Sequence, residues 1–311
     1  MKTRLRSLLT STALLLLGSL VTPARADILY VSNSSSETIE RFTLAGVGSI
    51  FASSGMNFPY GLAFDLTGNL YAASLGNSTI RKFSPAGVGS PFGSNGNVLN
   101  GPAGLAFDSA GNLYAANVGS DSIIKFNLSG VGSVFASSGL GGTTHGLAFD
   151  SMGNLYAANF ANNTIVKFTI SGVSSVFAST GLSSPRGLAF DSAGNLYVAN
   201  LGNNTIEKFT PGGLGSVFAS SGLNGPRGLA FDSTGNLYVA NANDNTIEKF
   251  TPGGVGSVFA DSNDGVRRPE YLAFTDDAGV PLKLANQVPE PMTGALLTIG
   301  FPALLGFRRR K

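Results

Sequence analysis

The stretch GLAFDSAGNLYVANLGNNTIEKFTPGGLGSVFASSGLNGPR, residues 187–227, decides the fold because the chain repeats it. Full copies begin 43, 42, 41 and 41 residues apart, at Gly61, Gly104, Gly146, Gly187 and Gly228, and a drifted sixth copy begins at Tyr271. A repeat of this length is typical of units that bury their hydrophobic faces only by stacking on neighbours. The 311 residues therefore predict one continuous repeat domain rather than two separate ones.

Each copy contains four short runs suited to β-strands. In residues 187–227 these runs lie at 188–190, 196–199, 205–209 and 216–219. They are rich in branched and aromatic residues, and Gly, Pro, Asn or Ser bounds each of them. No stretch within 27–287 combines helical periodicity with capping residues. The sequence thus predicts an all-β protein with four antiparallel strands in each unit.

The first connection of each copy has the composition of a tight turn. In DSAGN, residues 191–195, Asp191 can accept backbone hydrogen bonds and Gly194 can adopt the positive φ that completes a type I turn. The same pattern recurs at 65–69, 108–112, 150–154 and 232–236. A ring of aspartates also suggests calcium, but the turn accounts for each aspartate by itself. We therefore interpret these residues as turn residues, and the third connection, 210–213, as another hairpin.

The strand count closes into a ring. Before the first full copy, residues 28–31, 38–42 and 49–52 match the second, third and fourth strands of the unit. The missing first strand is found at the other end of the repeats, at 271–274. Radial stacking of such units removes long exposed strand edges. We expect a six-bladed β-propeller over residues 27–276, closed by strands from both termini, with an outlying strand or linker over 277–287.

The repeat resembles a known family. Gly-Leu-Ala-Phe-Asp followed by Gly-Asn-Leu-Tyr-Val-Ala-Asn, as in residues 187–200, is similar to the core of the NHL repeat. The resemblance extends over about residues 27–276 and implies a six-bladed propeller. Because proteins of this class differ widely in function, the resemblance supports the fold more than any activity.

The N-terminus resembles an export signal. Three basic residues, Lys2, Arg4 and Arg6, precede the apolar run 13–17, and small residues end in Ala-Arg-Ala at 24–26. This order is typical of a secretory signal peptide. We expect residues 1–26 to be removed after export; the alternative is a buried N-terminal helix.

The C-terminus contains a second candidate targeting signal. Val288, Pro289, Glu290 and Pro291 precede the apolar stretch 292–307 and the final cluster Arg308, Arg309, Arg310 and Lys311. This ending resembles the PEP-CTERM sorting signal of Gram-negative bacteria. The resemblance implies transient membrane insertion through 292–307, cleavage by an exosortase near 289–291, and delivery to the cell surface or an extracellular polysaccharide matrix. A plain membrane anchor is the alternative, although 16 residues span only about 24 Å as a helix.

The charge of the chain is concentrated at these two ends. The formal net charge is +2, but eight basic residues lie within 1–26 and 308–311. Without them and Glu290, 12 basic and 17 acidic residues remain. The propeller is therefore acidic overall, which argues against nucleic acid as a partner. The chain has no cysteine, so its stability depends on packing and ring closure.

Comparison of the copies indicates where a ligand could bind. The first and third connections lie on one face of the disc, here called the turn face, and are nearly identical between copies. The second and inter-blade connections lie on the other face, the rim face. There the residue before each first strand differs: Tyr60, Ala103, His145, Arg186, Arg227 and Glu270. First strands line a propeller's channel, so we predict a ligand site at Tyr60, His145, Arg186, Arg227 and Glu270.

The chemistry of these residues leaves alternatives open. Arg186 and Arg227 could together hold a carboxylate or sulfate, or could pair with Glu270. His145, the only histidine, could be an adapted loop residue. The asparagines that end the second strands are interpreted as partners of backbone groups, and Ser74 interrupts the series: Asn33, Asn117, Asn159, Asn200 and Asn241.

Enzymatic propellers provide the competing interpretation. Propellers similar to gluconolactonases hold a divalent metal among Glu, Asn and Asp, and those similar to virginiamycin B lyase depend on a histidine near a metal. Here Glu270 and His145 are isolated in the sequence, and no spacing assembles a metal site or a Ser-His-Asp triad. We therefore expect a monomeric, non-enzymatic protein without a cofactor that binds a glycan, peptide or protein, or that serves as a structural scaffold of the matrix. The alternative is a metal-dependent lyase or lactonase.

Overall fold

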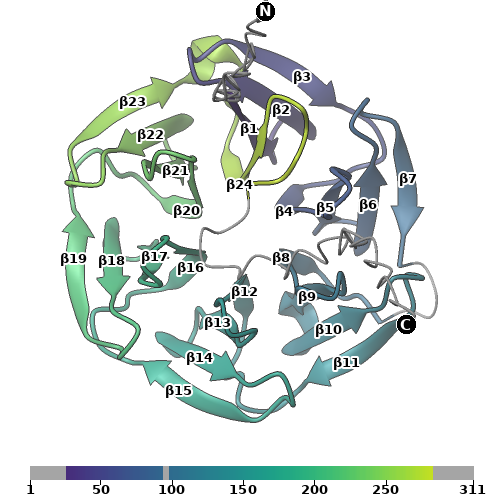
Figure 1. Cartoon of the computed structure of the whole chain (residues 1–311), viewed down its shortest axis with the longest axis vertical. Coiled ribbons are helices and arrows are strands. Elements are labelled where there is room, and N and C mark those ends of the chain that lie inside the picture. Colours follow the sequence, from purple (N-terminus) through teal and green to yellow (C-terminus); the bar gives the residue numbers. More distant parts are fainter. Residues whose placement is uncertain (1–25, 94–97, 283–311) are drawn as a thin grey trace, which may run out of the picture.

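The computed structural model describes residues 26–93 and 98–282, which form a six-bladed β-propeller (Figure 1). Each blade is one four-stranded antiparallel sheet, so the predicted fold is confirmed. Apart from strands, the described residues contain two short 3₁₀ turns, Val118–Ser120 and Ser262–Asp264. The predicted signal peptide and sorting signal lie outside the described residues, except for Ala26.

The blades follow one another around the ring, each with its first strand innermost (Figure 1). The first three sheets in chain order are β24 (Pro269–Asp276), β1 (Asp27–Asn33), β2 (Thr38–Thr43) and β3 (Gly48–Ala52); β4 (Pro59–Phe64), β5 (Leu70–Ser74), β6 (Thr79–Phe83) and β7 (Gly89–Phe92); and β8 (Pro102–Phe107), β9 (Leu113–Asn117), β10 (Ser122–Phe126) and β11 (Gly132–Ala136). The other three are β12 (Thr144–Phe149), β13 (Leu155–Asn159), β14 (Thr164–Phe168) and β15 (Ser174–Ala178); β16 (Pro185–Phe190), β17 (Leu196–Asn200), β18 (Thr205–Phe209) and β19 (Gly215–Ala219); and β20 (Pro226–Phe231), β21 (Leu237–Asn241), β22 (Thr246–Phe250) and β23 (Gly256–Ala260).

The ring is closed by the two ends of the repeat region. β24 pairs antiparallel with β1, from Asp27 opposite Asp276 to Asn33 opposite Pro269. After β24 the chain turns back, with a bridge between Thr275 and Pro281 and a hydrogen bond from the Leu282 N–H to the Phe274 carbonyl at 3.3 Å. The remainder of the outlying strand or linker that we predicted over 277–287, residues 283–287, lies outside the described residues.

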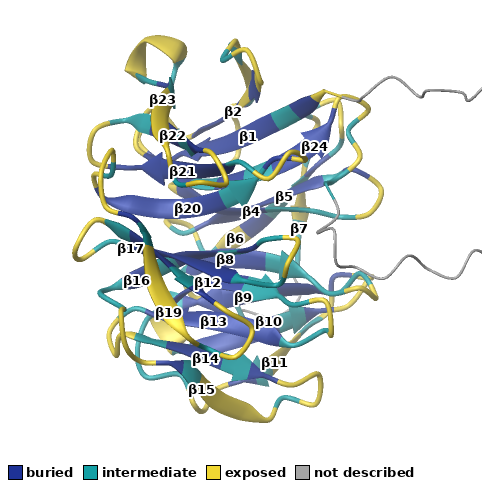
Figure 2. Cartoon of the chain, turned by 60° about the vertical axis from the view of Figure 1, so that its left-hand side comes forward, coloured by how far each residue is buried: buried dark blue, intermediate teal, exposed yellow. Residues whose placement is uncertain are grey.

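Aromatic residues pack the blades against one another. Each second-strand tyrosine stands between a phenylalanine of its own fourth strand and one of the next first strand. Tyr197, for example, lies 5.0 Å from both Phe218 and Phe231, measured between ring centroids, in edge-to-face geometry. Such pairs contribute about 0.5–1.5 kcal/mol beyond their buried area. Figure 2 shows the resulting burial: the inner strands are mostly buried, whereas outermost strands such as β19 carry exposed residues.

The repeated aspartates are turn residues, as predicted. Asp191 Oδ1 accepts the N–H groups of Ala193 and Asn195 at 2.9 and 2.8 Å, and Gly194 has φ +81°. The other carboxylate oxygen accepts the Asn195 amide at 2.8 Å and lies 3.6 Å from Lys208 Nζ. Each aspartate therefore fixes one hairpin of the turn face.

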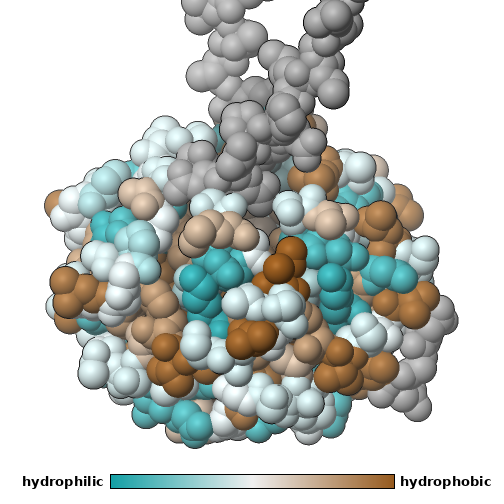
Figure 3. All heavy atoms as spheres, turned by 60° about the horizontal axis from the view of Figure 1, so that its bottom comes forward, coloured by the Kyte–Doolittle hydropathy of each residue, from teal (hydrophilic) through white to brown (hydrophobic). Residues whose placement is uncertain are grey.

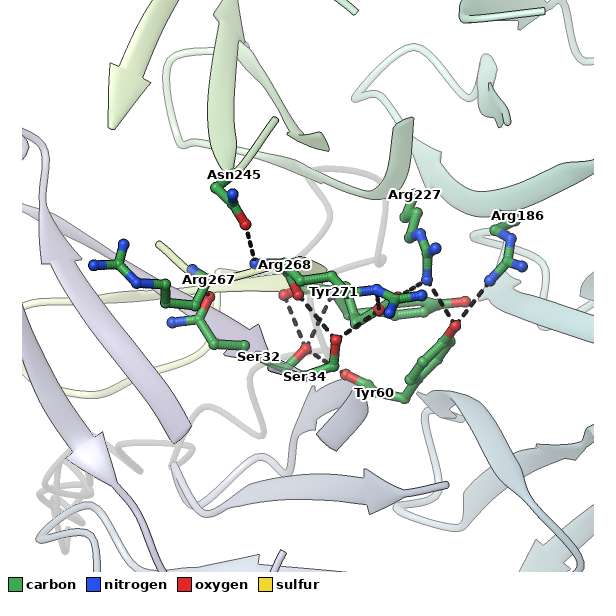
Figure 4. Close-up of polar contacts among 11 residues, drawn as sticks. Ser32, Ser34, Tyr60, Arg186, Arg227, Asn245, Arg267, Arg268 and Tyr271 are labelled. Atoms are coloured by element: carbon green, nitrogen blue, oxygen red, sulfur yellow. Dashed lines mark hydrogen bonds and ion pairs between the residues drawn. The ribbon is translucent and has the colours of Figure 1, made fainter. Parts of the chain in front are cut away.

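The glycine that opens each copy keeps the channel narrow. A Cβ at Gly187 would lie 2.0 Å from the Arg227 carbonyl oxygen in the next blade, and Gly61 is equally restricted by Ala103. Real Cβ atoms do not approach backbone this closely, so adjacent first strands require glycine here. Only the sixth copy departs from the pattern, with Tyr271, and Figure 4 shows that its ring extends toward Arg186 and Tyr60.

No helix of the described residues is both long and apolar enough to span a membrane.

Candidate functional site

The predicted rim residues lie at the second position of each first strand, one position inside the strand rather than before it. β16, for example, starts at Pro185, whose partner is Asn200, and the register shifts before Leu188. The sequence prediction began this strand at Leu188. In the structure Leu188 is the residue at which pairing resumes after a bulge. The strand thus starts earlier than predicted and carries Arg186 on the wall of the channel.

A repeated contact between blades sets the direction of these strands. The residue before each first strand has a left-handed backbone, such as Ser184 with φ +50°. Its N–H is donated to Asn163 Oδ1 of the preceding blade at 2.6 Å. Asn204 and Asn245 accept from the following blades in the same way. Each second connection therefore positions the rim residue of the next blade.

Four blades bring Tyr60, Arg186, Arg227 and Glu270 together. Figure 4 shows the side chains of Arg186 and Arg227 directed toward Tyr60. The Tyr60 hydroxyl accepts hydrogen bonds from Nη1 of Arg186 and Nη1 of Arg227, both at 2.9 Å. Arg227 Nη1 also lies 2.5 Å from Glu270 Oε2. Of the two alternatives for the arginines, Arg227 therefore pairs with Glu270, whereas Arg186 forms no ion pair with a carboxylate of the described residues.

Glu270 is a buried structural carboxylate. Its side chain is 1% exposed, and its second oxygen, Oε1, accepts from the Ser34 hydroxyl at 2.9 Å. Arg268 Nε lies 3.5 Å from the same oxygen. Both oxygens of Glu270 are thus occupied by groups of the protein itself.

Several donors of the same cluster have no partner. Buried atoms without a hydrogen bond to any described residue are Nδ1 of His145, Nε of Arg186, Nε of Arg227 and the hydroxyl of Tyr271. Leaving such a group unpaired costs about 1–3 kcal/mol. The cluster also has more arginines than carboxylates, since Arg227 and Arg268 share one glutamate and Arg186 donates only to the Tyr60 hydroxyl. The arrangement can therefore accept a further anionic group.

His145 lies within this cluster rather than in a free loop. It is 7% exposed, and its ring centroid is 5.3 Å from that of Phe160 and 6.4 Å from that of Tyr60. Burial, followed by the charges of Arg186 and Arg227, lowers the pKa of His145 from 6.5 to about 3. His145 is therefore neutral at physiological pH. Burial, followed by the nearby Glu270 charge, raises the pKa of Tyr60, so its hydroxyl stays protonated.

The loop before His145 is locally strained. Thr143 is a β-branched residue with φ +50°, and its hydroxyl is buried without a partner among the described residues. Thr144 takes the place of the usual proline at the start of β12. The sixth position, Ala103, is fully buried and adds only a methyl group.

The lowered pKa of His145 predicts an acid-sensitive fold. The unfolded chain takes up a proton near pH 6.5, whereas the folded chain does so only near 3, so the free energy of unfolding should fall as the pH drops below 6.5. The expected slope is at most about 1.4 kcal/mol per pH unit. Urea unfolding at pH 7, 6 and 5 should show a flatter dependence for His145→Gln. Equal losses in both proteins would contradict the prediction.

Four of the five strand-end asparagines satisfy backbone groups, as predicted, whereas Asn159 is hydrogen-bonded to the hydroxyls of Thr144 and Thr164. Asn200 Oδ1 accepts the Ser183 N–H at 3.1 Å, and its Nδ2 donates to the Gly181 carbonyl at 2.8 Å. Ser74 in the equivalent position accepts the Asn57 N–H at 3.4 Å. These side chains hold the inter-blade loops rather than a ligand.

The opposite end of the channel contains a cavity that the sequence analysis missed. It has a volume of about 690 Å³, and its inner wall is formed by Leu and Ala and by the phenylalanines that end the first strands: Phe64, Phe107, Phe149, Phe190, Phe231 and Phe274. Charged residues of two blades, Asp191, Lys208 and Asp232, also line it. The apolar run Gly-Leu-Ala-Phe in the first strands is a sequence signal for this cavity. The sequence analysis missed it because it interpreted the turn face only as a set of hairpin turns. In Figure 3 the hydrophobic residues of the visible side form separate groups among hydrophilic ones.

Within the described part of the chain, no three His, Cys, Asp or Glu side chains are grouped so that they could hold a metal ion. His145 contacts Tyr60 and Phe160, whereas Glu270 contacts Arg227 and Ser34. The two residues of the enzymatic alternative are thus engaged separately.

Comparison with known families agrees with this architecture. The model of the NHL repeat matches residues 182–209 and 223–250, which cover most of two blades. The chain contains NHL repeats. The other four blades have the same strand order and the same aromatic packing.

Solved structures share this fold at low sequence identity. A chain of a nidogen/laminin complex is 20% identical over 80% of this chain and 98% of its own, with a TM-score of 0.71. A catalytically inactive virginiamycin B lyase from Staphylococcus aureus with quinupristin is 15% identical, covers 83% and 94% of the two chains, and has a TM-score of 0.62. A gluconolactonase from Xanthomonas campestris is 15% identical, with 80% and 91% coverage and a TM-score of 0.60. No curated protein sequence matches the chain.

Proposed function

We propose that this propeller is an exported, non-enzymatic binding protein that takes an acidic group of a glycan, peptide or protein at the rim face. The observation that carries the proposal is the Tyr60, Arg186, Arg227 cluster, in which buried donors remain unpaired. Export and delivery to the cell surface or polysaccharide matrix are proposed from the N-terminal 1–26 signal and the PEP-CTERM-like ending, with exosortase as the processing partner.

Arg186 is the contact residue of this proposal. Its guanidinium lies over the Phe160 ring, 5.0 Å from the centroid, and donates to one neutral hydroxyl, Tyr60. A partly buried arginine in this state gains more from an anion than a solvated one, because the low local dielectric strengthens the interaction. Arg227 is held by Glu270 and therefore supports Tyr60 rather than competing for the ligand.

Binding of dextran sulfate to the purified protein tests the proposal, with uncharged dextran as the ligand control. Arg186→Met should weaken the affinity for dextran sulfate about tenfold, which corresponds to about 1.4 kcal/mol, a modest value for a charge-assisted hydrogen bond. Lys208→Met is the matched variant, because it removes the same charge from the same blade on the turn face. If both variants weaken binding equally, attraction is nonspecific and the rim site is wrong.

The alternative is a metal-dependent lyase or lactonase, supported by the fold that the chain shares with such enzymes. Elemental analysis of the purified protein separates the two proposals. A stoichiometric divalent ion that is lost in both His145→Ala and Glu270→Ala would favour the enzyme over the binding protein.

A further inference from the structure

We propose that the apolar end of the channel is a docking site for this chain's own apolar stretch 292–307, which it shelters before the stretch enters a membrane. This proposal concerns the turn face and is independent of the anion site on the rim face. It joins two features: a cavity with an apolar inner wall, and an apolar segment that would be exposed to water until it enters a membrane.

The inner wall of the cavity is apolar because the first strands carry Leu, Ala and Phe there, whereas Asp191, Lys208 and Asp232 line it on one side. Glycines bring adjacent strands together near the rim face, whereas Ala63, Ala106 and Ala148 and their equivalents leave space toward the turn face. All six blades contribute, each with the phenylalanine that ends its first strand. Filling this space with apolar side chains removes apolar surface from water.

The path of the chain selects the occupant. Pro281 and Leu282, at the end of the described region, themselves line the cavity, and Leu282 also packs against the core cluster that contains Val31 and Leu272. The chain therefore reaches the mouth of the cavity at Leu282. The nine residues 283–291 can extend about 30 Å. This length lets 292–307 fold back into the cavity of the same molecule.

The N-terminal apolar run is a less suitable occupant. Asp27 begins β1 on the same face, opposite Asp276, but its carboxylate is held by the Ser233 N–H at 2.7 Å. Residue 27 thus lies outside the cavity lining, whereas Leu282 is part of it. The two ends are therefore not equivalent with respect to the channel.

Disulfide cross-linking of the full chain tests this proposal, because the chain has no cysteine of its own. Ala189 lines the cavity, whereas Ala193 is exposed on the same face outside it. Under mild oxidation, Ala189→Cys with Leu297→Cys should form an intramolecular disulfide at least five times faster than Ala193→Cys with Leu297→Cys. Equal rates, or a product of dimer mass only, would overturn the proposal.

Two further variants keep the test decisive. Ala189→Cys with Leu15→Cys reports on the N-terminal apolar run. If this pair cross-links faster than Ala189→Cys with Leu297→Cys, the N-terminal run occupies the cavity and the proposal is wrong. Leu296→Asp with Leu297→Asp should expel the segment and raise anilinonaphthalene sulfonate fluorescence of the full chain severalfold. Unchanged fluorescence would show that the cavity was not occupied by 292–307.

Discussion

A chain that ends at Arg268 is expected to lose the cooperative unfolding transition of the propeller. It lacks β24, so β1 loses its inner partner and one blade keeps only three strands. Leu272 and Phe274 leave a core cluster that also contains Val31 and Tyr238. Deleting one such side chain costs about 2–5 kcal/mol, and the total stability of a domain is about 5–15 kcal/mol. Loss of a whole strand should therefore exceed what the ring can tolerate.

Thermal unfolding followed by circular dichroism measures this effect. The matched control is a chain that ends at Leu282, which keeps β24, the bridge between Thr275 and Pro281, and the Leu282 contacts. This control should unfold in one transition. If the chain ending at Arg268 melts at the same temperature as the control, closure by both termini does not stabilise the ring.

Replacing Glu270 with Gln should destabilise the protein by about 3–5 kcal/mol, the usual cost of breaking a buried ion pair by removal of one partner. Arg227 is 6% exposed and would keep its charge without a carboxylate, close to Arg186 and Arg268. The Ser34 hydroxyl would also lose its charged acceptor. Urea unfolding at pH 7 gives the free energy directly.

Two controls separate charge burial from general disruption. Lys208→Met breaks the more exposed Lys208–Asp191 pair and should cost less than about 1 kcal/mol. Arg227→Met combined with Glu270→Leu removes both buried charges and should be less destabilising than Glu270→Gln alone. If Glu270→Gln lowers the free energy of unfolding no more than Lys208→Met does, the Arg227–Glu270 pair does not stabilise the rim cluster.

The predictions from the sequence that held concern short-range geometry. Asp191 and Gly194 lie within one turn, and Asn200 reaches the loop that its own blade starts from. Such contacts join residues that lie a few positions apart or at a fixed offset within the repeat. They therefore form in every copy that keeps the same residues. The strand count, and with it closure by both termini, follows from the same regularity.

The predictions that fell short concern contacts across the ring. The prediction that Arg186 and Arg227 are rim residues did not specify their partners, since Tyr60 is 126 and 167 residues away from them in the chain. Whether these arginines pair with Glu270 or remain available for a ligand depends on which side chains meet at the axis of the ring. His145 was placed in the rim, but its burial against Phe160 and its lowered pKa come from neighbours in other strands.

The repeat alone thus determined the all-β class, six blades of four strands, the hairpin turns and the join between residues 27–33 and 269–276, because each follows from local turn chemistry and strand periodicity repeated around a circle. Only the tertiary structure decided that the rim face is a buried Tyr60–Arg227–Glu270 network and that the turn face opens into an apolar cavity. Both depend on how side chains from six blades meet at one axis. The sequence shows which positions face the axis, but the contacts between residues more than a hundred positions apart follow only from the closed ring.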